Sequence, residues 1–241
     1  MDSNGLEGVV VANTELSDVD GERGRLVIRG HDVEELALHH DFESACQLLW
    51  TGALPDSAAH TALRAALGRA RVRAFARLPS LGDALDAADA MDALRAALAH
   101  LRAGDIAATE LKLELTAAVA VFAAAWSRRR EGLAPLPPEP GLGHAADYLR
   151  MAGAGGAAAE RARALDAYLV TASDHGMNAS TFTARVVAST HSDAVSAVVS
   201  AIGALKGPLH GGAPGPALDM VFEIGTAERA ETVIRARLDR G

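Results

Sequence analysis

Apolar residues recur at three- and four-residue spacing along most of this chain, the pattern that predicts amphipathic helices. The clearest example lies between Asp41 and Gly52, where one face carries Phe42, Ala45, Cys46, Leu49 and Trp50. We expect Asp41 to cap this helix at its N-terminus and Gly52 to end it. Just before it, a second helical face is formed by Val33, Leu36 and Ala37.

Longer helical patterns fill the rest of the chain. The segment from Leu133 to Gly143 holds four prolines and predicts an extended linker, because proline cannot continue a helix. Before it, core helices are predicted for residues 56–77, 80–102 and 105–130, the last with a buried centre from Leu115 to Trp126. After it, helices are predicted for residues 144–151, 158–172, 194–205 and 217–224, with Pro214 and Pro216 in the first turn of the last one.

Only the first 32 residues show a β pattern. Val9, Val10 and Val11 form a short apolar run that predicts a first strand, and Arg25 to Ile28 predicts a second. Residues 18–24 are rich in Asp and Gly, which favours a turn between them. The sequence therefore predicts a small N-terminal β-hairpin.

Composition supports a mainly helical protein. The 241 residues are 49% hydrophobic but only 4% aromatic, and alanine dominates, which suits closely packed helices better than a sheet rich in Val, Tyr and Phe. This length is enough for one domain or one and a half. The fold class expected is all-α.

Charge and cysteine content narrow the function classes. A net charge of −8 gives no support for nucleic-acid binding, and the basic run Arg128 to Arg130 fits a helix C-terminus. Cys46 is the single cysteine, which excludes an intrachain disulfide, and its apolar setting predicts a buried thiol. No apolar run reaches membrane-spanning length and no signal peptide is evident, so we expect a cytoplasmic protein without membrane contact.

The candidate chemistry centres on two histidines 35 positions apart, His175 and His210. His210 lies in Gly-Pro-Leu-His-Gly-Gly-Ala-Pro, just before a predicted helix, where the dipole lowers the pKa of an imidazole and favours the neutral form. A neutral imidazole can donate an N–H to a developing enolate oxygen. His175 is followed by Asn178 and Ser180, a second polar cluster at the other end of an apolar segment.

Simpler interpretations stay open for both histidines. His210 could satisfy neighbouring carbonyl groups of a loop, and the cluster around His175 could cap a helix, with Asp174 as a cap or orienting group. His144 begins a predicted helix and is equally compatible with a structural role. No metal site is expected, because the spacing of metal ligands is absent among His31, His39, His40, His60, His100 and His191.

Four blocks of sequence resemble the citrate synthase family, in particular the bacterial citrate and 2-methylcitrate synthases. The most specific block runs from Asp174 through His210. The others lie at residues 5–36, at Phe42 to Pro55 with its Leu-Leu-Trp-Thr-Gly-Ala-Leu-Pro, and at His144 to Met151. The resemblance covers essentially the whole chain.

The resemblance implies an acyltransferase that condenses acetyl-CoA with oxaloacetate to give citrate and CoA, as in the tricarboxylic acid cycle. It matches His210 to the catalytic histidine that holds the thioester carbonyl, and His175, with Asn178 and Ser180, to the oxaloacetate pocket. The backbone of Leu209 and Gly211 falls on the CoA side. The resemblance implies no cofactor, because acetyl-CoA is a substrate, and it implies a homodimer formed through the alanine-rich helices.

The sequence also departs from the family pattern. The family's second catalytic histidine, its catalytic aspartate and the arginines that bind the dicarboxylate lie beyond residue 241. Gly143 replaces a common serine, and Pro214-Gly-Pro replaces a common Asn-Glu pair. We therefore expect this chain to be a C-terminally incomplete copy, inactive alone. The alternatives are a split enzyme, a non-catalytic dimerisation or oxaloacetate-binding module, and a 2-methylcitrate synthase that uses propionyl-CoA.

The expected organisation follows from this resemblance. Residues 1–32 form the hairpin segment, residues 33–210 the large helical domain, and residues 211–241 only the start of a small domain.

Overall fold

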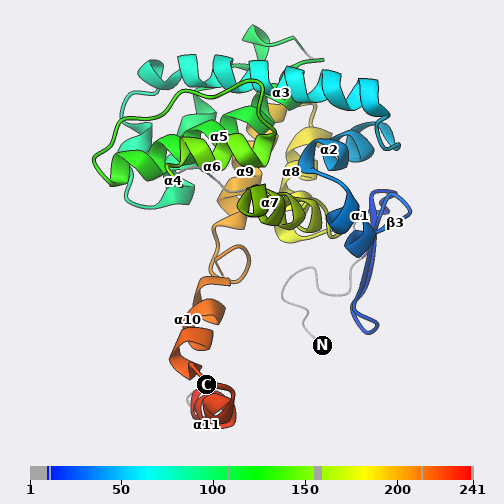
Figure 1. Ribbon diagram of the computed structural model, residues 1–241, viewed down its shortest axis with the longest axis vertical. Helices are drawn as coiled ribbons and strands as arrows, with labels where there is room; N and C mark the ends of the chain where they lie inside the picture. The colour runs from blue at the N-terminus through cyan, green and yellow to red at the C-terminus, as the bar shows by residue number, and fades with distance from the viewer. Residues whose placement is uncertain (1–9, 11, 108, 155–158, 213, 240–241) are drawn as a thin grey trace.

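The structure is a computed structural model that describes residues 10, 12–107, 109–154, 159–212 and 214–239. In these residues eleven α-helices accompany one small antiparallel sheet, so the expectation of an all-α fold with a hairpin is confirmed (Figure 1). The sheet consists of β1 (Ser17–Asp20), β2 (Arg25–Ile28) and β3 (His31–Asp32) in the order β1-β2-β3. The helices that follow are α1 (Val33–His39), α2 (Phe42–Thr51), α3 (Ser57–Ala76), α4 (Ala90–Ala99), α5 (Leu111–Arg130), α6 (His144–Met151), α7 (Ala159–Thr171), α8 (Ala179–Ser189), α9 (Ala194–Leu205), α10 (Pro214–Ile224) and α11 (Ala230–Leu238).

The predicted position of the first strand is wrong. The first strand begins at Ser17, which pairs with Ile28, and ends at Asp20, which pairs with Arg25. A tight turn joins the two strands, and Gly24 in this turn has a φ of 63°. Val10 lies outside any strand, and Val9 and Val11 are outside the described residues. The position of this mostly polar strand is determined by backbone pairing with β2. An apolar run elsewhere in the segment therefore does not predict it.

Caps explain why α2 and its neighbours begin and end where they do. The Asp41 carboxylate accepts a hydrogen bond from the Ser44 amide at 3.0 Å, and Gly52 ends α2 with a φ of 84°, as predicted. Asp56, Asp89 and Asp193 cap α3, α4 and α9 in the same way. These carboxylates satisfy amides that have no partner inside the helix.

The predicted helices at 80–102 and 105–130 both need correction. In the first region the chain makes short 3-10 turns at Leu78–Ser80 and Ala84–Asp86, and α4 starts only at Ala90. Gly82, with a φ of 58°, breaks the helical path between them. In the second, a 3-10 turn at Ala103–Asp105 precedes α5, which starts at Leu111.

The main core forms around α5. Leu98 of α4, Val121 and Phe122 of α5 and Met151 of α6 are at most 1% exposed and belong to one cluster, which also receives Val195 and Ile202 of α9. The predicted buried centre of α5 is confirmed, and Arg128, Arg129 and Arg130 occupy its last turn, as expected. A smaller cluster joins Ile28 of β2 to Leu48 of α2 and Val170 of α7, and it fixes the sheet to the helices.

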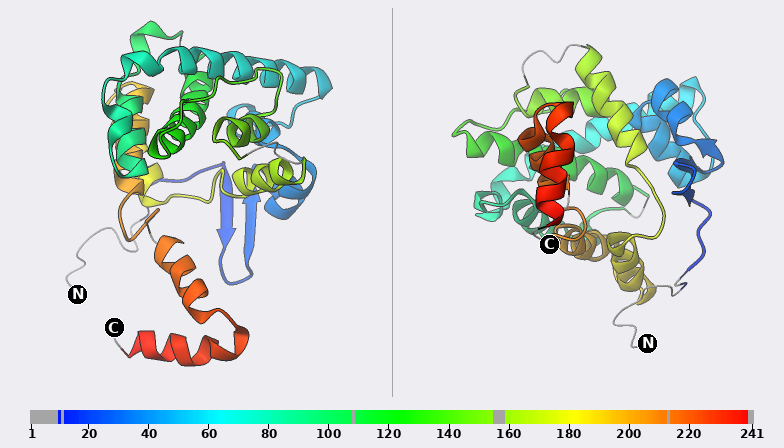
Figure 2. Two further views of the ribbon diagram at one scale, coloured as in Figure 1. Left: turned by 60° about the vertical axis from the view of Figure 1, so that its left-hand side comes forward. Right: turned by 90° about the horizontal axis from the view of Figure 1, so that it is seen from below.

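Helices α10 and α11 project from the helical body on the same side as the β1–β2 hairpin (Figures 1 and 2). Their large apolar side chains are exposed: Leu218, Val221, Phe222, Ile234 and Leu238 are between 40% and 75% accessible. We call α10 and α11 together the projecting arm. The turn that carries His210 connects this arm to α9.

Candidate functional site

The turn between α7 and α8 carries His175. Gly176 adopts a φ of 91° here, a conformation that favours glycine. Asn178 then caps α8, because its Oδ1 accepts a hydrogen bond from the Thr181 amide at 2.9 Å. Asn178 therefore has the capping role that the sequence left open. The capping hydrogen bond keeps its side chain close to the turn.

The polar side chains of this turn are hydrogen-bonded to one another. Asn178 Nδ2 lies 3.4 Å from His175 Nε2, and Ser180 Oγ donates to Asn178 Oδ1 at 2.8 Å. Because an amide nitrogen can only donate, His175 Nε2 is the acceptor in this contact.

His210 lies in a compact turn after α9. Its amide donates to the Gly207 carbonyl at 3.0 Å, and the Gly211 amide donates to the Leu205 carbonyl at 2.8 Å. A Cβ at Gly211 would lie 2.5 Å from the Leu205 oxygen, and one at Gly212 would lie 3.0 Å from that of Gly207. The packing of the turn therefore requires glycine at 211 and leaves little room for a side chain at 212, a reason that sequence analysis did not supply.

The two candidate clusters meet at Ser180. Its Oγ lies 2.9 Å from His210 Nε2, across 30 positions of sequence. The four residues His175, Asn178, Ser180 and His210 thus form one continuous row, which we call the histidine row. Because Ser180 has a single hydroxyl proton, it can donate to only one of Asn178 Oδ1 and His210 Nε2 at a time.

The histidine row lies at the surface of the described structure. His175 is exposed and His210 is half-buried, and the neighbouring Leu209 side chain is 98% accessible. Leu209 and Gly211 flank His210 along the backbone. A surface position leaves the row open to a ligand and also to water.

Asp174 is an orienting group, as one interpretation of the sequence proposed. Its Oδ1 accepts hydrogen bonds from the Gly176 amide at 3.2 Å and from the Ser17 hydroxyl of β1. Ser17 was missed by sequence analysis, because 157 positions separate it from Asp174 and nothing in its local pattern signals this contact.

His144 belongs to a different, buried cluster. Arg71 and Asp147, both fully buried, form an ion pair with Nε and Oδ2 2.7 Å apart, and the Arg71 guanidinium also lies 3.3 Å from His144 Nδ1. Burial and this cation lower the pKa of His144 to about 3, so its ring stays neutral. Glu43 Oε1 accepts a hydrogen bond from the His144 amide at 2.8 Å. These contacts favour the structural interpretation of His144.

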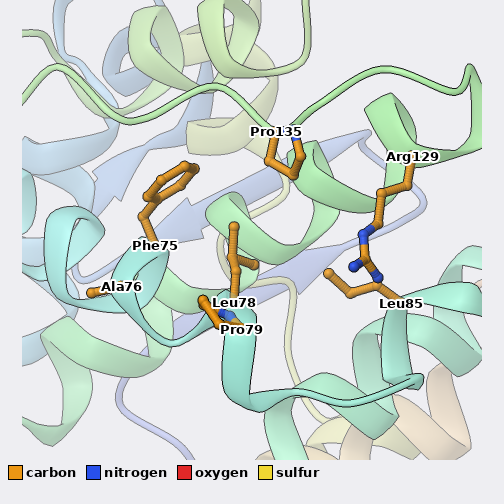
Figure 3. A pocket seen from close by; sticks show the side chains of 7 residues that line it. All are labelled: Phe75, Ala76, Leu78, Pro79, Leu85, Arg129 and Pro135. Atoms are coloured by element: carbon orange, nitrogen blue, oxygen red, sulfur yellow. The ribbon is translucent and has the colours of Figure 1, made fainter.

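Two apolar cavities lie away from the histidine row, and none of its four residues lines either of them. Figure 3 shows the first, of about 380 Å³, where Phe75, Leu78 and Pro135 form the walls beside Arg129. The second, of about 470 Å³, lies among α5, α6 and α7 and is lined in part by His144, Tyr148 and Tyr168.

Other structural findings concern metals, membranes and the thiol. Within the described ranges, no three His, Cys, Asp or Glu side chains gather in a way that could hold a metal ion. None of the described helices is both long and apolar enough to cross a bilayer. Cys46 is buried, and burial raises the pKa of its thiol.

Comparison with known proteins identifies the family. Residues 5–241 match the family model described as "Citrate synthase, C-terminal domain", and the chain belongs to the citrate synthase family. It is 39% identical to a citrate synthase of Mycolicibacterium smegmatis, over 98% of this chain and 65% of that protein. It is 40% identical to a 2-methylcitrate synthase of Mycobacterium tuberculosis, over 98% of this chain and 62% of that protein.

Solved structures agree with this assignment. The crystal structure of citrate synthase from Thermotoga maritima matches with a TM-score of 0.87 and 31% identity, covering all of this chain and 65% of that one. A Thermoplasma acidophilum citrate synthase, in a ternary complex with carboxymethyl coenzyme A and oxaloacetate, matches with a TM-score of 0.83 and 26% identity, over 98% of this chain and 64% of that one. The chain therefore spans just under two thirds of the length of these relatives.

Proposed function

We propose that this chain carries the oxaloacetate pocket and the carbonyl-polarising imidazole of an acyltransferase that condenses acetyl-CoA with oxaloacetate. The histidine row carries this proposal, because it brings His175, Asn178, Ser180 and His210 into hydrogen-bond contact from two separate turns. The names of the relatives support it, as does the presence of oxaloacetate and a coenzyme A analogue in the Thermoplasma acidophilum complex.

The chemistry assigns a different task to each histidine. A base removes a proton from the acyl methyl group, and the electron pair moves onto the thioester oxygen, where an N–H of His210 stabilises the negative charge. The resulting nucleophilic carbon attacks the ketone carbon of oxaloacetate, held by His175 with Asn178 and Ser180. As the new bond forms, the π bond of the ketone breaks and its oxygen takes up a proton to become the hydroxyl group of citrate. One water then cleaves the thioester and releases citrate and coenzyme A. In the cell this step would belong to the tricarboxylic acid cycle in the cytoplasm.

The base for the first step has no obvious candidate among the described carboxylates near His210. On α10, Asp219 is exposed and Glu223 accepts a hydrogen bond from Arg237 at 2.9 Å. The histidine row is also open to water, which weakens hydrogen bonds to a developing charge. We propose that this 241-residue chain, assayed alone, binds oxaloacetate but shows little or no turnover.

Calorimetry and a rate assay test this proposal together. Titration with oxaloacetate should show binding that is at least about tenfold weaker in His175→Ala, because the ligand loses a direct hydrogen-bond partner. His39→Ala, which removes an exposed histidine of α1, should bind like the original chain. Steady-state release of coenzyme A should stay near background. A rate like that of a complete enzyme would refute the inactivity, and absence of oxaloacetate binding would favour a pure dimerisation module.

A second candidate substrate is propionyl-CoA. The 40% identity to a 2-methylcitrate synthase favours it as strongly as the 39% identity to a citrate synthase favours acetyl-CoA. One additional methylene changes binding by only about 1–3 kcal/mol. Titration with each acyl-CoA in the presence of saturating oxaloacetate would rank the two substrates. Turnover that appears only after adding a second polypeptide would support the split-enzyme alternative.

We also propose a homodimer through the alanine-rich α5 and its neighbours α6 and α7. The apolar cavity of about 470 Å³ opens among these helices, and the Tyr168 side chain at its edge is 67% accessible. An exposed aromatic beside an apolar hollow is typical of protein interfaces. Sedimentation should show a dimer that Tyr168→Glu weakens. We further propose that residues 1–32 form the hairpin segment, residues 33–210 the large helical domain, and residues 211–241, which include the projecting arm, the start of the small domain.

A further inference from the structure

Strand β1 contacts the turn that carries His175. The Ser17 hydroxyl at the start of β1 donates a hydrogen bond to Asp174 Oδ1. Farther along the strand, Val19 Cγ2 lies 3.6 Å from the position that a Cβ at Gly176 would occupy. The residues on both sides of His175 therefore lie against the same strand, through one polar and one apolar contact.

Asp174 transmits the polar contact through the turn. The same Oδ1 atom that accepts from Ser17 also accepts from the Gly176 amide at 3.2 Å, and this amide follows His175 directly. The Gly176 carbonyl in turn accepts from the Asn178 amide at 3.1 Å. The carboxylate therefore fixes the backbone on both sides of His175 and, through Asn178, the side chain that contacts its imidazole.

Ser17 itself is held firmly. It pairs with Ile28 of β2, whose side chain is only 1% exposed and packs in the same cluster as Val170 of α7. The Leu16 carbonyl accepts from the Arg29 amide at 2.8 Å, which anchors the chain one residue earlier. Because α7 ends at Thr171, shortly before Asp174, the strand and the turn are both attached to the end of the same helix.

We propose that Ser17 is a positioning residue for the ligand site at His175. Its hydroxyl orients Asp174, and Asp174 sets the backbone that directs the imidazole toward Asn178. The positioning effect follows from the contacts alone, whereas oxaloacetate as the ligand rests on the proposed function. The N-terminal hairpin therefore supports the site through Asp174, although it lies outside the histidine row.

Three variants of the 241-residue chain test this role. Ser17→Ala removes the hydroxyl, and Ser17→Thr restores one at the same place. Thr14→Ala is the matched control, because Thr14 lies in the same segment and its hydroxyl accepts only from the nearby Leu16 amide, at 3.1 Å, among the bonds identified for it. Thermal unfolding of each variant establishes that the fold is intact.

The main measurement is made at the turn by NMR. In Ser17→Ala, the ring signals of His175 should shift toward those of a freely rotating imidazole, and the Gly176 amide should exchange with solvent about five- to tenfold faster. Ser17→Thr should return both toward the original values, and Thr14→Ala should leave them unchanged. Unchanged His175 signals and Gly176 exchange in Ser17→Ala would overturn the proposal, whether or not oxaloacetate binds.

Oxaloacetate calorimetry on the same variants separates this inference from the proposed function. If the original chain binds oxaloacetate, Ser17→Ala should weaken that binding about fivefold, and Ser17→Thr should recover it. Equal affinity in the original chain and Ser17→Ala would overturn the positioning role. If the original chain does not bind oxaloacetate but His175 still responds to Ser17→Ala, the positioning role stands and the proposed substrate is wrong.

Discussion

Ser180 Oγ lies 2.9 Å from His210 Nε2 and joins the first turn of α8 to the turn that follows α9. Ser180 also donates to Asn178 Oδ1, so one hydroxyl connects the two histidine-bearing segments. Since a hydroxyl has a single proton, Ser180 can donate to only one of these two partners at a time, and both contacts depend on this one side chain.

Loss of the Ser180 hydroxyl should weaken ligand binding at the histidine row without unfolding the protein. Ser180→Ala removes the bridge, and we expect oxaloacetate affinity to fall about five- to tenfold, which corresponds to the net worth of about one hydrogen bond. Ser189→Ala is the matched control, because its hydroxyl donates to the Val186 carbonyl at the far end of the same helix. Calorimetry measures the affinity, and equal losses in both variants would contradict a specific role for Ser180.

The stability of the protein should depend on His144 at acidic pH. Its pKa is about 3 in the folded chain and 6.5 in the unfolded one, so the unfolded state binds the proton first. The stabilisation is complete above pH 6.5 and is lost as the pH falls toward 3, by about 1.4 kcal/mol per pH unit.

Urea unfolding between pH 6.5 and 5 measures this dependence above the ordinary pKa range of carboxylates. His144→Gln should be less stable at neutral pH but should lose less free energy of unfolding as the pH falls. His39→Gln, which changes an exposed histidine, should keep the original slope. An unchanged slope in His144→Gln would show that the ring is protonated inside the fold.

Replacing one partner of the buried Arg71–Asp147 ion pair should strongly lower the free energy of unfolding. Asp147 Oδ1 also accepts from the Glu139 amide at 3.0 Å, so this carboxylate holds the linker as well as the guanidinium. Arg71→Leu removes the buried guanidinium and leaves Arg150, 3.0 Å from Asp147 Oδ1, as the cationic partner of the carboxylate, and we expect a loss of about 3 kcal/mol in the free energy of unfolding. Arg235→Ala, at an exposed pair with Glu231, should cost at most about 0.5 kcal/mol.

Two helical glycines should respond to alanine in opposite directions. A Cβ at Gly68 would overlap the carbonyl oxygen of Pro140 and lie 2.9 Å from its Cα, so Gly68→Ala should cost about 1–3 kcal/mol. A Cβ at Gly203 of α9 meets no described atom within 4 Å, and Gly203→Ala should stabilise the protein by about 0.5–1 kcal/mol. Urea unfolding of both variants checks the signs, and a stabilised Gly68→Ala would mean that the linker does not pack on α3.

Sequence reasoning predicted those elements whose signals are local. Residues 144–151 and 194–205 are helical as expected, and Asp41 and Gly52 bound α2, because periodicity, caps and glycine act within a few positions. The break around Gly82 was missed because alanine and leucine keep a helical period across it. The strand at Ser17 was missed because its pairing with β2, and not its own apolar content, determines it.

The candidate site divides in the same way. His175, Asn178, Ser180 and His210 were predicted from residue types and from a family resemblance, and the structure links them by hydrogen bonds. Their roles toward substrates stay predictions. Ser17 could not have been found, since its partner Asp174 is reached only through the folded chain.

The hydrogen bond from the His144 amide to Glu43 has a consequence for how the molecule assembles. Gly143, which precedes α6, has no side chain to cap the helix, and a carboxylate of α2, 101 positions earlier, accepts from the first amide of α6. The acceptor for the first amide of this helix, in the middle of the chain, is thereby supplied by a residue of the N-terminal quarter. The first turn of α6 therefore depends on the presence of α2, and shortening Glu43 should destabilise a helix that is remote from it in sequence.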